Sequence, residues 1–159
     1  MRIRVARVDE AGLLGSIAFE SKAYWKYSPE VMAGWREHLV VRLEPAACRP
    51  TFVAEEAGVV AGFCQVVIEG AVPDLDHLWV RPAFIGRGFG RALLGRASAT
   101  LTELGYTRLR IDAEPHAEAF YRRCGATRTG DVPAPIAGDP GRVRPQMTLV
   151  LAPQAPPSP

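Results

Sequence analysis

The amino-acid sequence predicts a single α/β domain of the α+β type, with a mixed, mostly antiparallel central sheet of about seven strands and about four flanking helices. The length of 159 residues is that of one domain, which can bury a core without metal or disulfide cross-links. Three short apolar segments of strand type follow one another before a long helical pattern begins. Because strands and helices do not alternate one by one, a doubly wound parallel fold is not expected.

Seven segments show the polar–apolar alternation or the continuous apolar run of a strand. Ala57-Gly58 separates two of them, and such a two-residue connection favours a hairpin. The predicted strands are residues 2–7, 51–56, 59–69, 75–80, 107–112, 127–132 and 147–151. Residues 133–145, rich in proline, glycine and arginine, are expected to form the loop between the last two strands.

Four segments carry apolar residues at helical spacing. Asp9 is placed to cap a helix that runs to about Tyr24, and Ser28-Pro29 is typical of a second helix start. The third helix follows the glycine-rich residues 85–90, and the fourth ends before Gly125. We assign residues 1–151 to the domain and the proline-rich residues 152–159 to a disordered tail.

Composition excludes several classes of function. The formal net charge is only +2, and the sequence has neither a basic block for nucleic acid nor an apolar run long enough for a membrane helix. The three cysteines, Cys48, Cys64 and Cys124, are far apart and odd in number. They provide no metal-ligand spacing and favour reduced thiols in a cytoplasmic protein, so we expect no bound metal.

The most informative stretch is the turn between the predicted strand 75–80 and the third helix, Ile85-Gly86-Arg87-Gly88-Phe89-Gly90. The first N–H groups of a helix lack intrahelical partners and the helix dipole favours negative charge. A strand, a glycine turn and a helix in this order therefore favour anion binding, and Arg87 and Arg91 add positive charge.

Three interpretations of this turn are open: glycines used only for packing, a Rossmann fingerprint with Asp112 on the ribose, and a coenzyme A pyrophosphate site. Glycines at 86, 88 and 90 do not match G-x-G-x-x-G, because Arg91 occupies the place of the third glycine. Val80-Arg81-Pro82, the turn itself and Leu93-Leu94 resemble motif A of the GNAT superfamily of acetyl-CoA-dependent N-acetyltransferases, V-x-P-x-x-[QR]-x-x-G-x-[GA]. Ile85 departs from it, standing where Gln or Arg is usual.

The resemblance implies a GNAT-like fold with acetyl-CoA as the acetyl-donor cosubstrate. The amide groups of the turn would hold the pyrophosphate, and the backbone of the preceding strand would hold the pantetheine arm. The coenzyme-binding residues that motif A implies are Leu78, Trp79, Val80, Ile85, Gly86, Arg87, Gly88, Phe89, Gly90 and Arg91.

Residues 112–126 resemble the second GNAT signature, [DN]-x-N-A-x-x-F-Y-x-x-x-G-[FA]. Glu114 and His116 stand where Asp or Asn is common, and the resemblance implies coenzyme contacts from His116, Ala117, Phe120 and Tyr121. The side-chain amide that binds the pantetheine arm in the family is either replaced by His116 or lost. The resemblance also implies that Tyr121 protonates the departing thiolate, which suits a phenol with a pKa near 10. A half-buried aromatic that merely bonds the backbone is the alternative.

The second catalytic task is to take a proton from the ammonium group of the acceptor. Asp74 and Asp76 are two residues apart and share a face of a regular strand, whereas His77 lies on the opposite face unless a bulge intervenes. We rank Asp76 first as the base, then His77, then Asp74. A surface salt bridge is the alternative role for each.

The acceptor is expected to be a primary amine of a small molecule or peptide. Tyr24, Trp25 and Trp35 lie where GNAT proteins build one wall of the acceptor pocket, and core packing is their alternative role. Arg142 would bind a carboxylate or phosphate of the acceptor, unless it is a solvated loop residue.

The activity that the resemblance implies is acetyl transfer from acetyl-CoA to a primary amine by direct attack in a ternary complex. A non-catalytic coenzyme A-binding module, acting as a sensor or partner, is the first alternative, and a dinucleotide-binding enzyme is the second. No nucleic-acid or membrane partner is expected. Homodimers are frequent in the family, although nothing in the sequence locates an interface.

Overall fold

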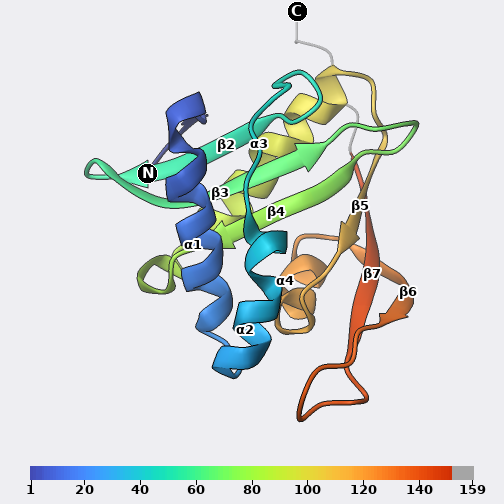
Figure 1. The fold of residues 1–159 in the computed structure, drawn as a ribbon. Helices are drawn as coiled ribbons and strands as arrows, with labels where there is room; N and C mark the ends of the chain where they lie inside the picture. The colour runs from blue at the N-terminus through green and yellow to red at the C-terminus, as the bar shows by residue number, and fades with distance from the viewer. Residues whose placement is uncertain (152–159) are drawn as a thin grey trace, which may run out of the picture.

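The computed structural model describes residues 1–151, and the predicted tail at 152–159 lies outside the described residues. Within this range the chain forms a seven-stranded sheet with the strand order β1-β2-β3-β4-β5-β7-β6 (Figure 1). The strands are β1 (Arg2–Val5), β2 (Thr51–Glu56), β3 (Val59–Val67), β4 (Asp74–Val80), β5 (Arg108–Asp112), β6 (Thr127–Pro133) and β7 (Val143–Val150). The predicted single domain with a mixed, mostly antiparallel sheet is confirmed.

Four α-helices of the described chain flank the sheet, with α1 and α2 in front of it and α3 behind it in Figure 1. They are α1 (Ala11–Ala23), α2 (Pro29–Trp35), α3 (Phe89–Glu103) and α4 (Glu118–Arg123). The short 3-10 turns are η1 (Val8–Glu10), η2 (Arg36–Leu39), η3 (Pro82–Phe84) and η4 (Pro115–Ala117). None of the helices in this part of the chain is long and apolar enough to cross a membrane.

The sheet carries a separate apolar core on each face. Leu93 and Leu101 of α3 belong to the same apolar cluster as Ile111 of β5 on one face, and Leu14 of α1 shares a cluster with Phe63 of β3 on the other. All five side chains are buried. Removing this apolar surface from water fixes both helices to the sheet, so that the strands between them are held on both sides.

The strands β4 and β5 are the only parallel neighbours among the described strands, and they pair over two residues alone. Asp74 pairs with Arg110 and Leu75 pairs with Ile111; beyond this point the two strands separate. The remaining backbone of β4 on that edge therefore has no ladder partner in β5. Since a doubly wound parallel sheet is absent from the described chain, the dinucleotide-binding interpretation of Asp112 has no structural basis.

A β-bulge interrupts β4 at Asp76. Gln65 of β3 pairs with His77 and the next residue of β3 pairs with Leu75, which leaves Asp76 as the extra residue. The burial of the candidate bases differs along this strand. Asp76 is exposed and His77 is buried, while Asp74 has an intermediate exposure.

Two local predictions need correction, and one is confirmed. Asp9 does not cap the first helix: it lies in η1, and Glu10 instead accepts a hydrogen bond of 2.7 Å from the Arg7 N–H. Ser28 caps α2 as predicted, because its hydroxyl accepts from the Val31 N–H. The predicted loop 133–145 is too long, since β7 already begins at Val143. Pro145 joins the sheet through its carbonyl, which accepts from the Ala113 N–H at 2.9 Å.

Candidate active site

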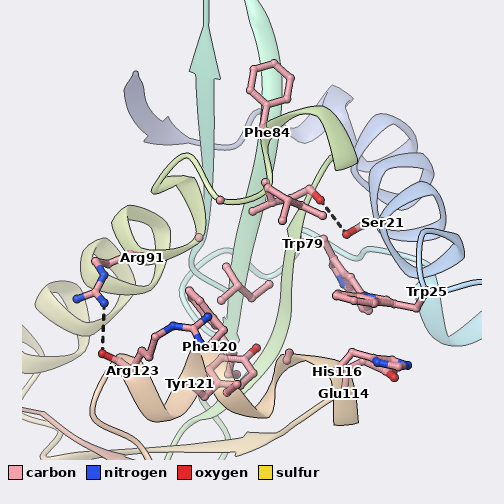
Figure 2. Close-up of a pocket in the computed structure, with 18 of the residues that line it drawn as sticks. Ser21, Trp25, Trp79, Phe84, Arg91, Glu114, His116, Phe120, Tyr121 and Arg123 are labelled. Carbon is pink, nitrogen blue, oxygen red and sulfur yellow. Dashed lines mark hydrogen bonds between the residues drawn. The ribbon is translucent and has the colours of Figure 1, made fainter.

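A cavity of about 430 Å³ opens where β4 and β5 separate (Figure 2). The end of β4, the glycine turn, the start of α3, and the segment from β5 to α4 surround it, and Ser21 and Trp25 of the α1 region close one side. Its lining residues are Ser21, Trp25, Leu75, Asp76, Leu78, Trp79, Val80, Phe84, Ile85, Gly86, Gly88, Gly90, Arg91, Asp112, Glu114, His116, Ala117, Ala119, Phe120, Tyr121 and Arg123.

The glycine turn presents bare backbone to this cavity. Gly88 has a φ of +86°, a left-handed conformation that favours glycine, and it immediately precedes α3. At Gly90 a Cβ atom would lie 3.3 Å from the ring of Phe120, so a side chain there would compete with α4 for space. The first N–H groups of α3 have no intrahelical partners, and together with the helix dipole they form a site suited to an anion.

Two predicted coenzyme contacts from this turn do not line the cavity. Arg87 forms an ion pair with Glu56, with Nη2 and Oε2 2.5 Å apart, and its guanidinium lies over the Phe84 ring. Phe89, the first residue of α3, is buried in the core. Arg91 does line the cavity, and its Nη2 donates to the backbone carbonyl of Arg123 at 3.3 Å.

Tyr121 lies on α4 at the wall of the cavity, with only 6% of its surface exposed. Burial raises the pKa of its phenol, and the nearby Cys64, Cys124 and Glu114 raise it further. Within residues 1–151 its hydroxyl has no hydrogen-bond partner, and its ring meets Phe120 edge to face. The predicted alternative, a hydroxyl bonded to the backbone, is therefore absent from this part of the chain.

The three candidate bases occupy different environments. Asp76 lines the cavity and is loosely paired, 3.6 Å from Arg49 and 3.7 Å from His77 Nε2. Asp74 lies outside the lining and accepts two hydrogen bonds from Arg110, at 2.8 and 2.7 Å. The structure therefore brings Asp76 to the cavity and leaves Asp74 at the surface, in the salt-bridge role given above as its alternative.

His77 is held behind the cavity wall. Its Nδ1 accepts a hydrogen bond of 3.0 Å from Trp79 Nε1, and because an indole N–H can only donate, Nδ1 carries no proton. The proton of the neutral ring therefore lies on Nε2, which faces Asp76. Burial lowers the pKa of His77, an effect that Asp76 opposes, so the imidazole is neutral at pH 7.

A buried charge cluster forms behind the end of the cavity opposite the glycine turn. Lys22 Nζ donates to Glu114 at 2.8 Å, Tyr27 donates to the same carboxylate, and Arg142 lies 3.3 Å from it. The exposed side-chain fractions are 12% for Lys22, 9% for Glu114 and 6% for Arg142. Lys22 also lies 4.0 Å from the centre of the Trp35 ring. We call these five residues the charge cluster.

The charge cluster alters the ionisation of its members. Burial lowers the pKa of Lys22, although Glu114 opposes this shift. Burial alone would raise the pKa of Glu114, but the charge of Lys22 and the hydrogen bonds of the cluster outweigh it and lower that pKa. Tyr27 reaches a pKa of about 12 through burial and its bond to Glu114. Glu114 is therefore a carboxylate at neutral pH and a poor proton acceptor.

The aromatic residues predicted for the acceptor wall divide into two groups. Trp25 lines the cavity and stacks on His116, with ring centres 4.6 Å apart and planes 4° apart. Tyr24 is half-exposed outside the lining and meets Trp25 edge to face. Trp35 and Arg142 do not reach the cavity, because they lie behind Glu114 in the charge cluster. Arg142 is thus a buried residue rather than the solvated loop arginine of the alternative.

Sequence reasoning missed several lining residues, among them Ser21, Phe84, Glu114 and Arg123. Ser21 donates to the carbonyl of Val80 at 2.9 Å, a contact over 59 positions that no local pattern reveals. Glu114 carried a signal, because it stands in the second motif where Asp or Asn is common. Arg123 also carried one, since it lies on the same short helix as Tyr121.

Comparison with known proteins agrees with this geometry. Residues 48–125 match the family described as "Acetyltransferase (GNAT) domain". The PaiA N-acetyltransferase of Thermoplasma acidophilum, solved with coenzyme A, is 18% identical with a TM-score of 0.74, over 94% of this chain and 99% of that one. YncA of Salmonella typhimurium, solved with acetyl-CoA, is 22% identical with a TM-score of 0.71, over 99% and 98% of the two chains.

A third solved structure, a GCN5-related N-acetyltransferase from Rhodopseudomonas palustris, is 22% identical with a TM-score of 0.73, over 94% of this chain and 95% of that one. At these identities the likeness establishes the fold, and the family match adds the two sequence motifs to it. The fold, the glycine turn and the family match agree, and the chain belongs to the GNAT superfamily of acetyltransferases.

Proposed function

We propose that this protein transfers the acetyl group of acetyl-CoA to a primary amine of a small molecule or peptide, by direct attack in a ternary complex. One observation carries the proposal. Tyr121 is a buried residue whose hydroxyl has no hydrogen-bond partner in the described chain, and it lines the same cavity as the glycine turn. A proton donor and an anion site then lie along one continuous channel, as transfer from a phosphorylated thioester requires.

The residues present fit such a donor. Gly90 has no side chain, and Phe120 leaves little room for one, so the backbone N–H groups at the start of α3 are open to a diphosphate. Beyond Leu75, the peptide groups of β4 that do not pair with β5 can bind an extended pantetheine arm. Acetyl-CoA, when bound, supplies an activated acyl group as a thioester. A backbone N–H near residues 78–80 would stabilise the negative charge that develops on the acyl oxygen.

Tyr121 would act as the general acid. Burial keeps its phenol protonated at neutral pH, so it can give a proton to a thiolate as the carbon–sulfur bond breaks. The raised pKa also means that Tyr121 does not serve as a base before the amine attacks. Its position on α4, beside the end of β4, fits a role at the sulfur rather than at the diphosphate.

Asp76 would act as the base, directly or through a water molecule. It lines the cavity, whereas the Nδ1 lone pair of His77 is taken up by Trp79 and Asp74 is bound by Arg110. His77 would position Asp76 by presenting its Nε2–H to the carboxylate. The acceptor amine would enter between Trp25, Trp79 and Glu114, which line this end of the cavity.

The test is the Tyr121→Phe variant, assayed with acetyl-CoA and a panel of amines by release of free thiol. We expect kcat to fall by about 100-fold or more, with coenzyme A binding unchanged in a thermal-shift assay. Tyr106→Phe is the matched control, because Tyr106 is a partly buried tyrosine that packs against the core outside the cavity. Coenzyme binding without turnover by the wild-type protein on any amine would favour the non-catalytic module instead.

The base assignment has its own paired test. Asp76→Asn should lower kcat, whereas Asp74→Asn should leave kcat unchanged. Equal losses in the two variants would contradict the assignment of Asp76.

A further inference from the structure

Most arginines of the described chain face a carboxylate, and two on the cavity wall do not. Arg87, Arg110 and Arg122 illustrate the rule, each with a carboxylate oxygen within 2.7 Å. Arg91 and Arg123 both line the cavity, and neither forms an ion pair with any of the residues 1–151. Two guanidinium groups without counter-charges at one cavity wall are a site for an anion.

The two arginines come from different elements and meet at one place. Arg91 lies in the first turn of α3, and Arg123 ends α4. The hydrogen bond from Arg91 to the Arg123 carbonyl holds the two residues close together. Both positive charges also act on the nearby Cys124: burial raises the pKa of its thiol, and the two arginines lower that pKa. Figure 2 shows both on the side of the cavity away from Trp25, His116 and Glu114.

The two guanidinium groups are distinct from the backbone N–H groups of the helix start, although Arg91 itself belongs to the first turn of α3. The backbone N–H groups of the glycine turn already provide a site for a diphosphate without any side chain. Arg91 and Arg123 are exposed, whereas Tyr121 is buried at the reacting end. In coenzyme A the group farthest from the thioester is the phosphorylated nucleotide, which therefore lies at the exposed end of the channel when the sulfur reaches Tyr121.

We propose that Arg91 and Arg123 form a second phosphate subsite, which binds the 3′-phosphate of coenzyme A and makes the protein discriminate against dephospho-coenzyme A. This inference rests on the proposed function and adds the specificity for the donor. A phosphate monoester is close to a dianion at pH 7 and accepts hydrogen bonds on three oxygens, so two guanidinium groups match it in charge and geometry.

The experiment is calorimetric titration of the protein with coenzyme A and with dephospho-coenzyme A, which keeps the diphosphate and lacks the 3′-phosphate. We expect the wild-type protein to bind coenzyme A about tenfold or more tightly than the dephospho form, because charged hydrogen bonds are lost. In Arg123→Gln the preference should fall to near one, with the affinity for the dephospho form unchanged.

The matched control is Arg122→Gln, since Arg122 is adjacent, exposed and paired with Glu118, and it lies outside the cavity lining. It should keep the wild-type preference. No preference in the wild-type protein, or an equal loss for both ligands in Arg123→Gln, would overturn the inference while leaving the proposed function intact. Binding of neither ligand by the wild-type protein would overturn both.

Discussion

The two ends of the cavity are built in different ways. The glycine-turn end consists of backbone from one continuous stretch, residues 85–91, where the sequence itself dictates the geometry. The opposite end depends on the charge cluster, in which Lys22, Glu114 and Arg142 come from three distant segments. The first end needs only local conformation, whereas the second exists only when the whole fold is formed. Substitutions at the glycine-turn end should therefore change mainly the affinity for the coenzyme, and substitutions in the charge cluster should change mainly the free energy of unfolding.

The largest effect is expected from breaking the charge cluster. Glu114→Gln would leave Lys22 and Arg142 buried without a counter-charge, which we expect to lower the free energy of unfolding by roughly 3–5 kcal/mol in urea denaturation. Glu69→Gln is the control, because the Glu69 side chain is largely exposed and 3.7 Å from Arg49, and it should change stability little. A loss in both variants of equal size would show that the cluster carries no special weight.

The ion pair between Glu10 and Arg4, which lies outside the cavity, tests whether a buried ion pair affects stability without affecting coenzyme binding. Glu10 accepts two hydrogen bonds from Arg4, at 2.7 and 2.9 Å, and this contact, opposed by burial, lowers its pKa to about 2. Because the folded-state pKa lies below the unfolded value, the stabilisation is complete above pH 4.5 and is lost as the pH falls toward 2.

Its removal should therefore affect stability alone. Glu10→Gln should lose roughly 2–3 kcal/mol at pH 7 and show a flatter decline of stability below about pH 4.5 than the wild-type protein. Coenzyme A affinity should stay the same in this variant. Weaker coenzyme binding would mean that the N-terminal ion pairs are coupled to the cavity.

The glycine-turn end should respond mainly in coenzyme affinity. Gly90→Ala places a Cβ against Phe120, and we expect coenzyme A to bind about tenfold more weakly, equal to about 1.4 kcal/mol. Calorimetric titration measures this loss. An unchanged affinity would contradict the assignment of this turn to the diphosphate.

The smallest effect is expected from a matched glycine in the same helix. Gly95 lies inside α3 with open space around its Cα, so Gly95→Ala should raise the free energy of unfolding by about 0.5–1 kcal/mol through helix propensity. Its coenzyme affinity should equal that of the wild-type protein. Thermal unfolding with and without coenzyme A separates the two glycine variants.

The same division explains what the sequence could predict. The seven strands, the glycine turn and the helix that carries Tyr121 follow from spacing and turn residues within about thirty positions, so local patterns identify them. No local sequence pattern predicts which residues form ion pairs when they are far apart in the chain. Arg87 binds Glu56 and Arg142 meets Glu114, and both pairings depend on strand order. The bulge at Asp76 depends likewise on the register with β3.

The brief pairing of β4 with β5 divides the sheet along a seam. Four strands lie on one side of it and three on the other, and two residue pairs join the halves within the sheet. An extended ligand lying in this gap would contact both halves of the sheet. On the proposed function, the bound donor would therefore stabilise the contact between the two halves, and that stabilisation would be lost and regained in each turnover.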